Sequence, residues 1–276
     1  MALTVNNNLV AFRAANTLNS TQGALSQTLA RVSTGLRVNS AADDAAGSAV
    51  AANLSTQARS GRQAIRNAND GISVIQTAEA ATKEVGNILD RMRELAVQSS
   101  SETLANSERA YINDEFDALS DEIERIADAT EFNGLNLANG DKSTLTVQVG
   151  VTAGTESEVA ISLGDISISN LGVATTDADL TLASSAQTAI TTIDTAIDSV
   201  NSIRASYGAT QNRLDSSINN MSAYVESLTG AASQIMDADY AHETAEMTRL
   251  QVMQQAGVAA LGQARSMNTS VIGLLG

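Results

Sequence analysis

The stretch SSAQTAITTIDTAIDSVNSIRASYGATQNRLDSSINNMSAYVESLTG, from Ser184 to Gly230, decides the fold. Its large apolar residues recur at alternating three- and four-residue steps, interrupted only by Arg204 and Gln211. The row consists of Ile190, Ile193, Ile197, Val200, Tyr207, Leu214, Ile218, Met221, Val225 and Leu228. A heptad row kept over about six repeats predicts a helix that presents one stripe to partner helices along a left-handed supercoil. At ~1.5 Å rise per residue the helix would be about 65–70 Å long, so we expect an elongated bundle.

Composition also favours long helices over a large globular core. Aromatic residues make up 3 % of the 276 residues, and Trp is absent. The chain has no Cys and no Pro, so folding depends on neither disulfides nor prolyl isomerisation, and every backbone N–H is available to a helix. Our hypothesis is that such a chain refolds quickly after passing unfolded through a narrow channel.

The charge argues against two classes of partner. The formal net charge is -15, and the 14 Arg residues are scattered among acids, whereas a nucleic-acid surface needs a clustered positive face. We expect no membrane association either, because no stretch approaches the ~20 apolar residues of a span. The segment from Met1 to Val10 lacks the basic and apolar regions of a signal peptide. Taken alone, these features predict a cytoplasmic protein.

Both ends of the chain predict single amphipathic helices. Toward the N-terminus, Leu18, Leu25 and Val32 form one seven-residue series, and Leu29 and Leu36 form the other, with Gln22 in the same seam. The C-terminal seam consists of Met247, Leu250, Leu261, Ala264, Val271 and Leu275. Because a single amphipathic helix is marginal alone, we expect the two to pair with each other and with other copies. A joint is expected near 37–44, where Ser40 and Asp43 have the spacing of a helix cap.

Between these ends the pattern predicts two further helices and then strands. Apolar spacing stays in register across Asn69-Asp70-Gly71, which favours one helix from about 60 to 99, and it resumes in an antiparallel helix from Ile112 to Ile126. Alternation at Leu145, Val147 and Val149, and again from Val159 to Leu163, predicts strands in hairpins, with turns at Asn133-Gly134, Asn139-Gly140 and Gly150–Gly154. The predicted fold class is mainly α: a long antiparallel bundle with small β-hairpins at one end, and termini pairing as a second coiled coil.

Catalytic chemistry has little support in the sequence. His242, the only histidine, stands in His242-Glu243-Thr244-Ala245-Glu246, which lacks the second histidine of a zinc-protease helix. Without a second His or any Cys there is no nucleophile–base pair to assemble. We therefore expect no enzyme activity, no cofactor and no metal.

Several motifs resemble those of bacterial flagellins, in flagellin order. Ser33-Thr34-Gly35-Leu36-Arg37-Val38-Asn39-Ser40 followed by Asp43-Asp44-Ala45-Ala46-Gly47 resembles the N-terminal signature. The other motifs are Arg66-Asn67-Ala68-Asn69-Asp70-Gly71-Ile72-Ser73, Arg93-Glu94-Leu95-Ala96-Val97-Gln98-Ser99, Phe132-Asn133-Gly134, Gln211-Asn212-Arg213-Leu214, Asp239-Tyr240-Ala241 and Gln254-Gln255-Ala256-Gly257. Any one can arise by chance in a helical protein, but their joint order over nearly the whole chain is specific.

The resemblance implies a structural subunit that is exported unfolded through the flagellar type III apparatus and polymerises into the extracellular filament used for motility. It further implies that residues 1–43 and 235–276 form the inner-tube coiled coil and 44–234 the outer-tube domain, with hairpins at about 131–175. Only about ten residues separate Ser169 from Leu180, where many flagellins carry variable outer domains, so a minimal form is expected. The implied partners are other copies, an export chaperone, a cap protein and the hook-associated junction protein.

One further partner follows from resemblance to flagellins of enteric bacteria, which a vertebrate Toll-like receptor senses through an Arg, a Leu and a Glu. Arg91 and Leu95 match by motif, and Glu115 matches by position, beside Asp114. Burial between subunits is expected of the same helix face.

Other functions stay open at this stage. A hook–filament junction protein shares the terminal helices, and a secreted coiled-coil adhesin or translocator would share the long bundle. A translocator should bind liposomes, yet no helix here has the basic amphipathic face that such binding prefers.

Overall fold

The computed structural model describes residues 8–174 and 179–273, with side chains through Ser266. The chain divides into two compact units, one made of Met1–Gln57 with Glu226–Gly276 and the other of Ala58–Val225. The elements run in the order α1 (Leu9–Thr34), α2 (Ala45–Ser99), α3 (Asn106–Ala129), β1 (Glu131–Phe132), β2 (Leu135–Asn136), β3 (Thr144–Gln148), η1 (Thr155–Ser157), β4 (Glu158–Ser162), α4 (Ile168–Leu171), α5 (Ala183–Met236) and α6 (Tyr240–Gly273).

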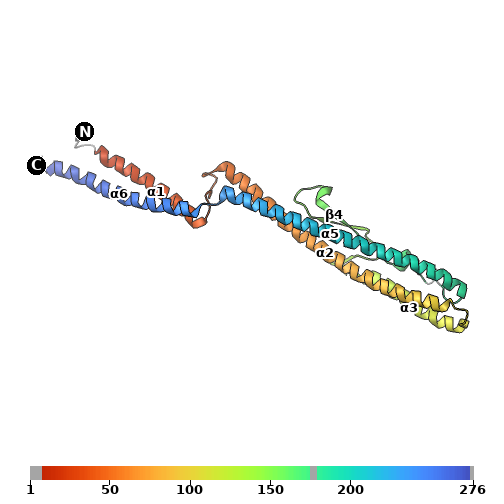
Figure 1. Cartoon of the computed structure of the whole chain (residues 1–276). Helices are drawn as coiled ribbons and strands as arrows, with labels where there is room; N and C mark the ends of the chain where they lie inside the picture. The colour runs from red at the N-terminus through yellow and green to blue at the C-terminus, as the bar shows by residue number, and fades with distance from the viewer. Residues whose placement is uncertain (1–7, 175–178, 274–276) are drawn as a thin grey trace. The chain divides into compact units, whose positions relative to one another are not determined.

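Three helices lie side by side in the unit 58–225: α2, the antiparallel α3, and α5 (Figure 1). The predicted row of α5 faces inward, with Ile193, Tyr207 and Leu214 fully buried. Helix α2 is continuous through Asn69-Asp70-Gly71, as the apolar register indicates. The predicted mainly α fold, with long packed helices and small antiparallel hairpins, is confirmed.

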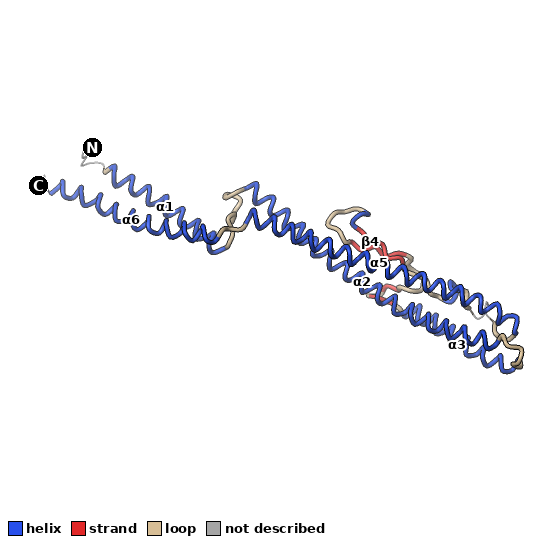
Figure 2. Tube along the Cα trace, viewed as in Figure 1, coloured by secondary structure: helices blue, strands red, loops and turns tan. Residues whose placement is uncertain are grey.

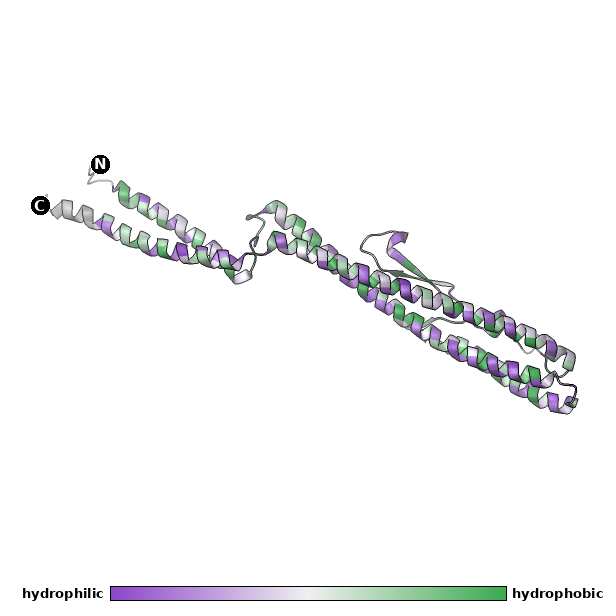
Figure 3. Cartoon of the chain, in the orientation of Figure 1, coloured by the Kyte–Doolittle hydropathy of each residue, from purple (hydrophilic) through white to green (hydrophobic). Residues whose placement is uncertain are grey.

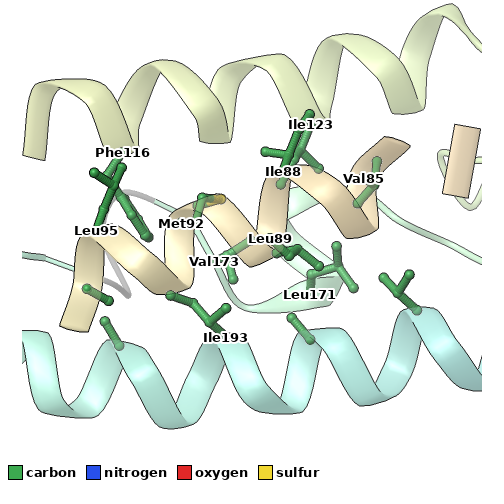
Figure 4. Packing of buried hydrophobic residues seen from close by; sticks show 14 of the residues in the cluster. Val85, Ile88, Leu89, Met92, Leu95, Phe116, Ile123, Leu171, Val173 and Ile193 are labelled. Atoms are coloured by element: carbon green, nitrogen blue, oxygen red, sulfur yellow. The ribbon is translucent and has the colours of Figure 1, made fainter. Parts of the chain in front are cut away.

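The α3 end of this unit has an apolar core to which all three helices contribute. Figure 4 shows Phe116 and Ile123 of α3 pointing toward α2, where Met92 and Leu95 lie, while Ile193 reaches in from α5. The buried Arg109 fastens the α2–α3 turn, because its Nε donates to the Ser99 carbonyl at 2.8 Å and its Nη2 to the Ser101 carbonyl at 2.7 Å.

Two short hairpins pack beside α2 and α5 (Figure 2). β1 and β2 are joined by Asn133 and Gly134, whose φ angles of 53° and 76° are the left-handed values that a two-residue turn needs. β3 and β4 pair antiparallel with Val147 opposite Val159. Strand alternation then turns Val147, Val159 and Ile161 toward one core, so the predicted strands are confirmed.

In the other unit the loop after α1 pairs with the loop before α6. Gly35, in the left-handed conformation, ends α1, and its carbonyl accepts from Ala238 N at 2.9 Å. Arg37 donates two hydrogen bonds across this pair of loops. Its backbone N donates to the Met236 carbonyl at 2.6 Å, and its Nη2 donates to the Ile235 carbonyl at 2.7 Å. The expected joint near 37–44 is present.

The helix cap predicted at this joint is wrong, because the Ser40–Asp43 spacing makes Ser40 the N-cap, whereas α2 begins at Ala45. Asp43 Oδ2 accepts from the backbone N of Ser40 at 3.0 Å and of Asn39 at 3.2 Å, so it closes the turn, and these bonds lower its pKa. The cap of α2 is Asp44, whose Oδ1 accepts from Gly47 N at 2.8 Å. Asp43 therefore closes the turn in the loop, and the adjacent Asp44 caps α2.

The boundaries of the compact units fall within α2 and α5, at 57/58 and 225/226, and not in the loops at 35–44 and 237–239. The predicted division at 43/44 and 234/235 stays a prediction; 43/44 falls in the first loop, and 234/235 lies two residues before the end of α5. Its assignment to an inner and an outer tube remains a proposal.

We predict that Leu214→Ala lowers the free energy of unfolding of the unit 58–225 by about 2–5 kcal/mol. Leu214 is fully buried, so truncation removes apolar contact and leaves a cavity. Denaturant unfolding followed by circular dichroism measures the change, with the exposed Asn219→Ala on the same helix as the control. An unfolding free energy equal to that of the control would contradict the burial of this row.

Candidate functional site

The first candidate surface is the antiparallel pair of α1 and α6. Leu25 of α1 and Leu250 of α6 are buried, while Leu18, Val32 and Leu261 are half-buried. The helices approach closely at Gly257, where an added Cβ would lie 3.3 Å from Leu18 Cδ1. Pairing of the two terminal helices, predicted from their single apolar stripes, is what the structure shows.

Three polar contacts tie this pair together along its length. Asn8 Nδ2 donates to the Ala264 carbonyl at 2.9 Å, and Gln254 Nε2 donates to Gln22 Oε1 at 3.0 Å. Arg31 Nη1 lies 3.3 Å from Oε1 of the buried Glu243, which sequence reasoning missed. An unpaired buried charge is costly, so this ion pair favours a single register of α1 on α6.

The second apolar series predicted for α1 is wrong in part. Leu29 is 45 % exposed, whereas Thr21 and Thr28 are each only 6 % exposed and complete the inward row. Leu29 lies one position, about 100° of helix rotation, beyond Thr28. Thr21 tolerates burial because its Oγ1 donates to the Thr17 carbonyl at 2.8 Å, and the seven-residue step from Thr21 to Thr28 is the signal that could have revealed them.

The remaining predicted seam positions lie elsewhere. Leu36 follows the end of α1 and is half-buried in the loop, where it bridges to Asp237. Val271 falls in α6 beyond the described side chains, and Leu275 lies outside the described residues.

Both terminal helices expose large apolar side chains away from their shared seam. Those of α1 are Leu9, Val10, Phe12 and Leu29, and those of α6 include Val252, Met253 and Val258. Hydrophobic positions recur along both helices in Figure 3. Scattered exposed apolar residues are ordinary, but a helix with apolar residues on several sides is typical of a fully buried helix. The pair therefore has further apolar surface to bury.

A second candidate surface joins α2 and α3. Arg91 Nη2 donates to Glu115 Oε1 at 2.7 Å, its Nε donates to the same oxygen at 3.1 Å, and its Nη1 donates to Glu94 Oε2 at 2.9 Å. The hydrogen bond to Glu115 is the main cause that raises the pKa of Arg91. Both side chains are 48 % exposed, so the structure brings Arg91 and Glu115 together at the surface.

Leu95 does not belong to this surface. It is 1 % exposed and points into the core near Phe116 (Figure 4). The expected direct contact through Leu95 is therefore corrected: one turn after Arg91, its side chain faces the bundle interior, where it supports the helix.

The outer side of α3 carries many carboxylates. Asp114, Asp121 and Asp128 are exposed at seven-residue intervals. The half-buried Asp117 lies beside them, with Oδ2 accepting from Asn113 Nδ2 at 2.9 Å. Desolvation is the first cause that raises the pKa of Asp117, followed by the charges of Asp114, Asp121 and Asp179. This side of the helix is strongly negative.

The described residues contain neither a metal-binding cluster nor a helix that could span a membrane. No group of three or more His, Asp or Glu side chains among them is placed to hold a metal ion, and His242 is exposed. None of the described helices is both long and apolar enough to cross a membrane.

Family models match most of the chain. The model described as the bacterial flagellin N-terminal helical region matches residues 5–143, and the bacterial flagellin C-terminal helical region matches 190–275. The chain belongs to the flagellin family. The resemblance to bacterial flagellins, which the sequence motifs indicated, is thereby confirmed.

Similar curated proteins agree with this assignment. A flagellin of Halalkalibacterium halodurans is 42 % identical over 271 residues, covering 98 % of this chain and 99 % of the relative. Polar flagellin C of Vibrio parahaemolyticus is 32 % identical in an alignment of 383 positions that covers both chains completely. That alignment exceeds the 276 residues here, so the Vibrio protein contains segments that this chain lacks. The short chain fits a minimal flagellin.

One solved structure adds support at the level of fold alone. A putative flagellar hook-associated protein from Vibrio parahaemolyticus aligns with a TM-score of 0.60 and 16 % identity, covering 71 % of this chain and all of the other.

Family membership defines the coarse function. The chain is a structural subunit of the bacterial flagellar filament, which lies outside the cell, and it is not an enzyme. The cytoplasmic location expected from composition alone is therefore wrong.

We predict that Asp117→Asn raises the thermal midpoint of the unit 58–225 at pH 7. The folded-state pKa of Asp117 is raised, so its ionised form costs stability above that pKa, and the cost disappears as the pH falls below the unfolded value near 3.8. Thermal unfolding between pH 3 and 7 measures this. The difference between wild type and variant should shrink toward acid pH, and a constant difference would contradict the electrostatic cause.

Proposed function

We propose that the chain is exported unfolded through the flagellar type III apparatus and polymerises through α1 and α6 into the inner tube of a filament that drives motility. The observation that carries the polymerisation step is the apolar surface that this helix pair leaves exposed. One register fixed by Arg31 and Glu243 presents a defined surface to other copies. Residues 44–234 would then form the outer tube.

The composition and fold support export in an unfolded state. The sequence has no Cys and no Pro, so neither disulfide formation nor prolyl isomerisation delays refolding. Contacts within long helices are local, and local contacts favour fast folding. By family membership we further infer binding to an export chaperone, a cap protein and the hook-associated junction protein.

The competing function is that of a junction subunit, because a hook-associated protein has a similar fold. The copy number of the chain in sheared flagella separates the two functions. A filament subunit makes up nearly all of the mass, whereas a junction subunit is a trace component.

We predict that Val252→Asp combined with Val258→Asp prevents polymerisation. Both side chains are exposed on α6, so charge there should leave the folded monomer intact and make burial between copies unfavourable. Sedimentation and electron microscopy of the purified full chain measure filament formation.

The matched control for this test is Gln251→Asp with Gln255→Asp, which adds equal charge at exposed polar positions of the same helix. The critical concentration for polymerisation of the control should be at least tenfold lower than that of the valine variant. Normal filaments from the valine variant would show that this exposed surface of α6 is not part of the assembly surface.

We also propose that the exposed Arg91–Glu115 pair is recognised by the vertebrate Toll-like receptor that senses flagellin. The pair supports this role by its exposure and its geometry, since a guanidinium forms bidentate hydrogen bonds that Lys does not reproduce. Leu95 would act only as the core residue beneath the pair.

We predict that Arg91→Ala weakens receptor signalling by the monomer tenfold or more, while Arg125→Ala has little effect. Arg125 is the control because it is also exposed and paired, with Glu122. The readout is reporter-cell signalling at equal subunit concentration, and cross-linked filaments should signal less than monomer because assembly covers the site. Equal potency of the two alanine variants would disprove the assignment.

A further inference from the structure

One methionine stands on the apolar surface that α6 leaves exposed. Met253 is 41 % exposed, and the neighbouring Val252 is exposed as well. All methionines except Met1 and Met267 have described side chains. Met92 is fully buried in the core, and those that are half-buried are Met221, Met236 and Met247. Among the described methionines, Met253 is therefore the one whose thioether lies on the outside of a helix.

A guanidinium group lies against the sulfur atom of Met253. Arg249 Nη1 donates to Met253 Sδ at 3.4 Å, one turn along α6. This guanidinium is fixed in turn by Glu246, whose Oε2 accepts from Arg249 Nε at 2.8 Å and whose Oε1 accepts from Nη2. The three residues follow one another at three- and four-residue steps, so they share one side of the helix. A charged N–H donor is thus already placed beside the sulfur.

This arrangement suits oxidation of the thioether to a sulfoxide. A sulfur lone pair attacks one oxygen of a peroxide, so an S–O bond forms as the O–O bond breaks. The sulfur is oxidised, the peroxide is reduced, and the proton on the transferred oxygen passes to the leaving hydroxide to give water. In the folded monomer the exposed side chain of Met253 is open to the oxidant, whereas Met92 is enclosed by the core.

The product differs from the thioether in its polarity. A thioether sulfur is a weak hydrogen-bond acceptor, whereas a sulfoxide oxygen is polar. Arg249 can donate to that oxygen, and a hydrogen bond from a charged donor is stronger than one from a neutral donor. The sulfoxide is thus stabilised at the surface of the monomer. Moving it into an apolar interface costs free energy, because the polar group loses its water.

We propose that Met253 is a site of reversible oxidation by peroxides, and that its sulfoxide keeps an unassembled chain out of the polymer. The proposal rests on the assembly function of α6 proposed above and names a regulation of that surface. Because Met253 stands beside Val252, on the surface that would be buried between copies, assembly and oxidation exclude each other. A peroxide then acts on free monomers and spares the subunits that are already in place.

The first measurement is the rate of sulfoxide formation at each methionine. Full-length monomer and preformed filament are treated with hydrogen peroxide at equal subunit concentration, and proteolytic peptides are quantified by tandem mass spectrometry. In the monomer, Met253 should be oxidised tenfold or more faster than Met92 and about threefold or more faster than each half-buried methionine. In the filament its rate should fall tenfold or more. Oxidation no faster than at the half-buried methionines, or equally fast in monomer and filament, would overturn the proposal.

The second measurement is the critical concentration for polymerisation after oxidation, with Met253→Leu and Met247→Leu as matched variants on the same helix. Leu keeps the apolar volume and lacks the thioether, so both untreated variants should polymerise like wild type. Peroxide should raise the critical concentration tenfold or more for wild type and Met247→Leu, but less than about threefold for Met253→Leu. Equal impairment of oxidised Met253→Leu and oxidised wild type would assign the effect to another residue and refute the proposal.

Enzymatic reduction separates the sulfoxide from other oxidative damage without any substitution. Methionine sulfoxide reductases of both epimer specificities, supplied with a thiol reductant, should return Met253 to the thioether. The critical concentration should then come within about threefold of that of untreated wild type. Assembly that stays impaired after Met253 is reduced would contradict the proposal. Untreated wild-type chain that forms no filaments would instead overturn the proposed function, whereas the oxidation rates in the monomer test the modification site independently.

Discussion

The close packing of α5 on α2 is the constraint on which the rest of the unit 58–225 depends. Gly61 lets the helices approach, because an added Cβ would lie 2.5 Å from Val225 Cγ2. Gly71 does the same for β3, where an added Cβ would lie 3.1 Å from Val147 Cγ2. At the other end of the hairpin, the buried Tyr207 hydroxyl accepts from Gly164 N at 3.0 Å, and burial raises the pKa of this phenol. One helix pair therefore also positions the strands.

Periodicity predicted the helices and strands because each element has its own hydrophobic period and its own turn residues. The row of α5 and the Asn133-Gly134 turn are clear examples, since apolar burial and positive φ leave few alternatives. Periodicity gave wrong predictions where the polarity of a residue does not match its burial. Thr21 and Thr28 are buried although polar, and Leu29 is exposed although apolar. The cap at Asp44 also escaped prediction, because the adjacent Asp43 offers the same carboxylate and only local geometry separates them.

The candidate sites were less predictable than the fold. Arg91 was matched by motif and Glu115 by position, and the structure pairs them, but the same motif match included Leu95, which points inward. The apolar spacing of Leu89, Met92 and Leu95 along α2 indicates the buried side of the helix, which a motif match does not take into account. The buried Glu243 is a different case, because its partner Arg31 lies more than two hundred residues away.

The two units use apolar surface and charge in different ways, and this difference suits a chain that must stay soluble before it assembles. The α1–α6 pair leaves large apolar side chains exposed, whereas α3 concentrates acids on an exposed side. A net charge of -15 keeps monomers apart in solution. The same repulsion opposes packing of many copies, so burial of the exposed apolar side chains of α1 and α6 has to outweigh it when chains assemble. Apolar burial is non-directional, whereas the Arg31–Glu243 ion pair favours one register of α1 on α6, so affinity and alignment come from different interactions.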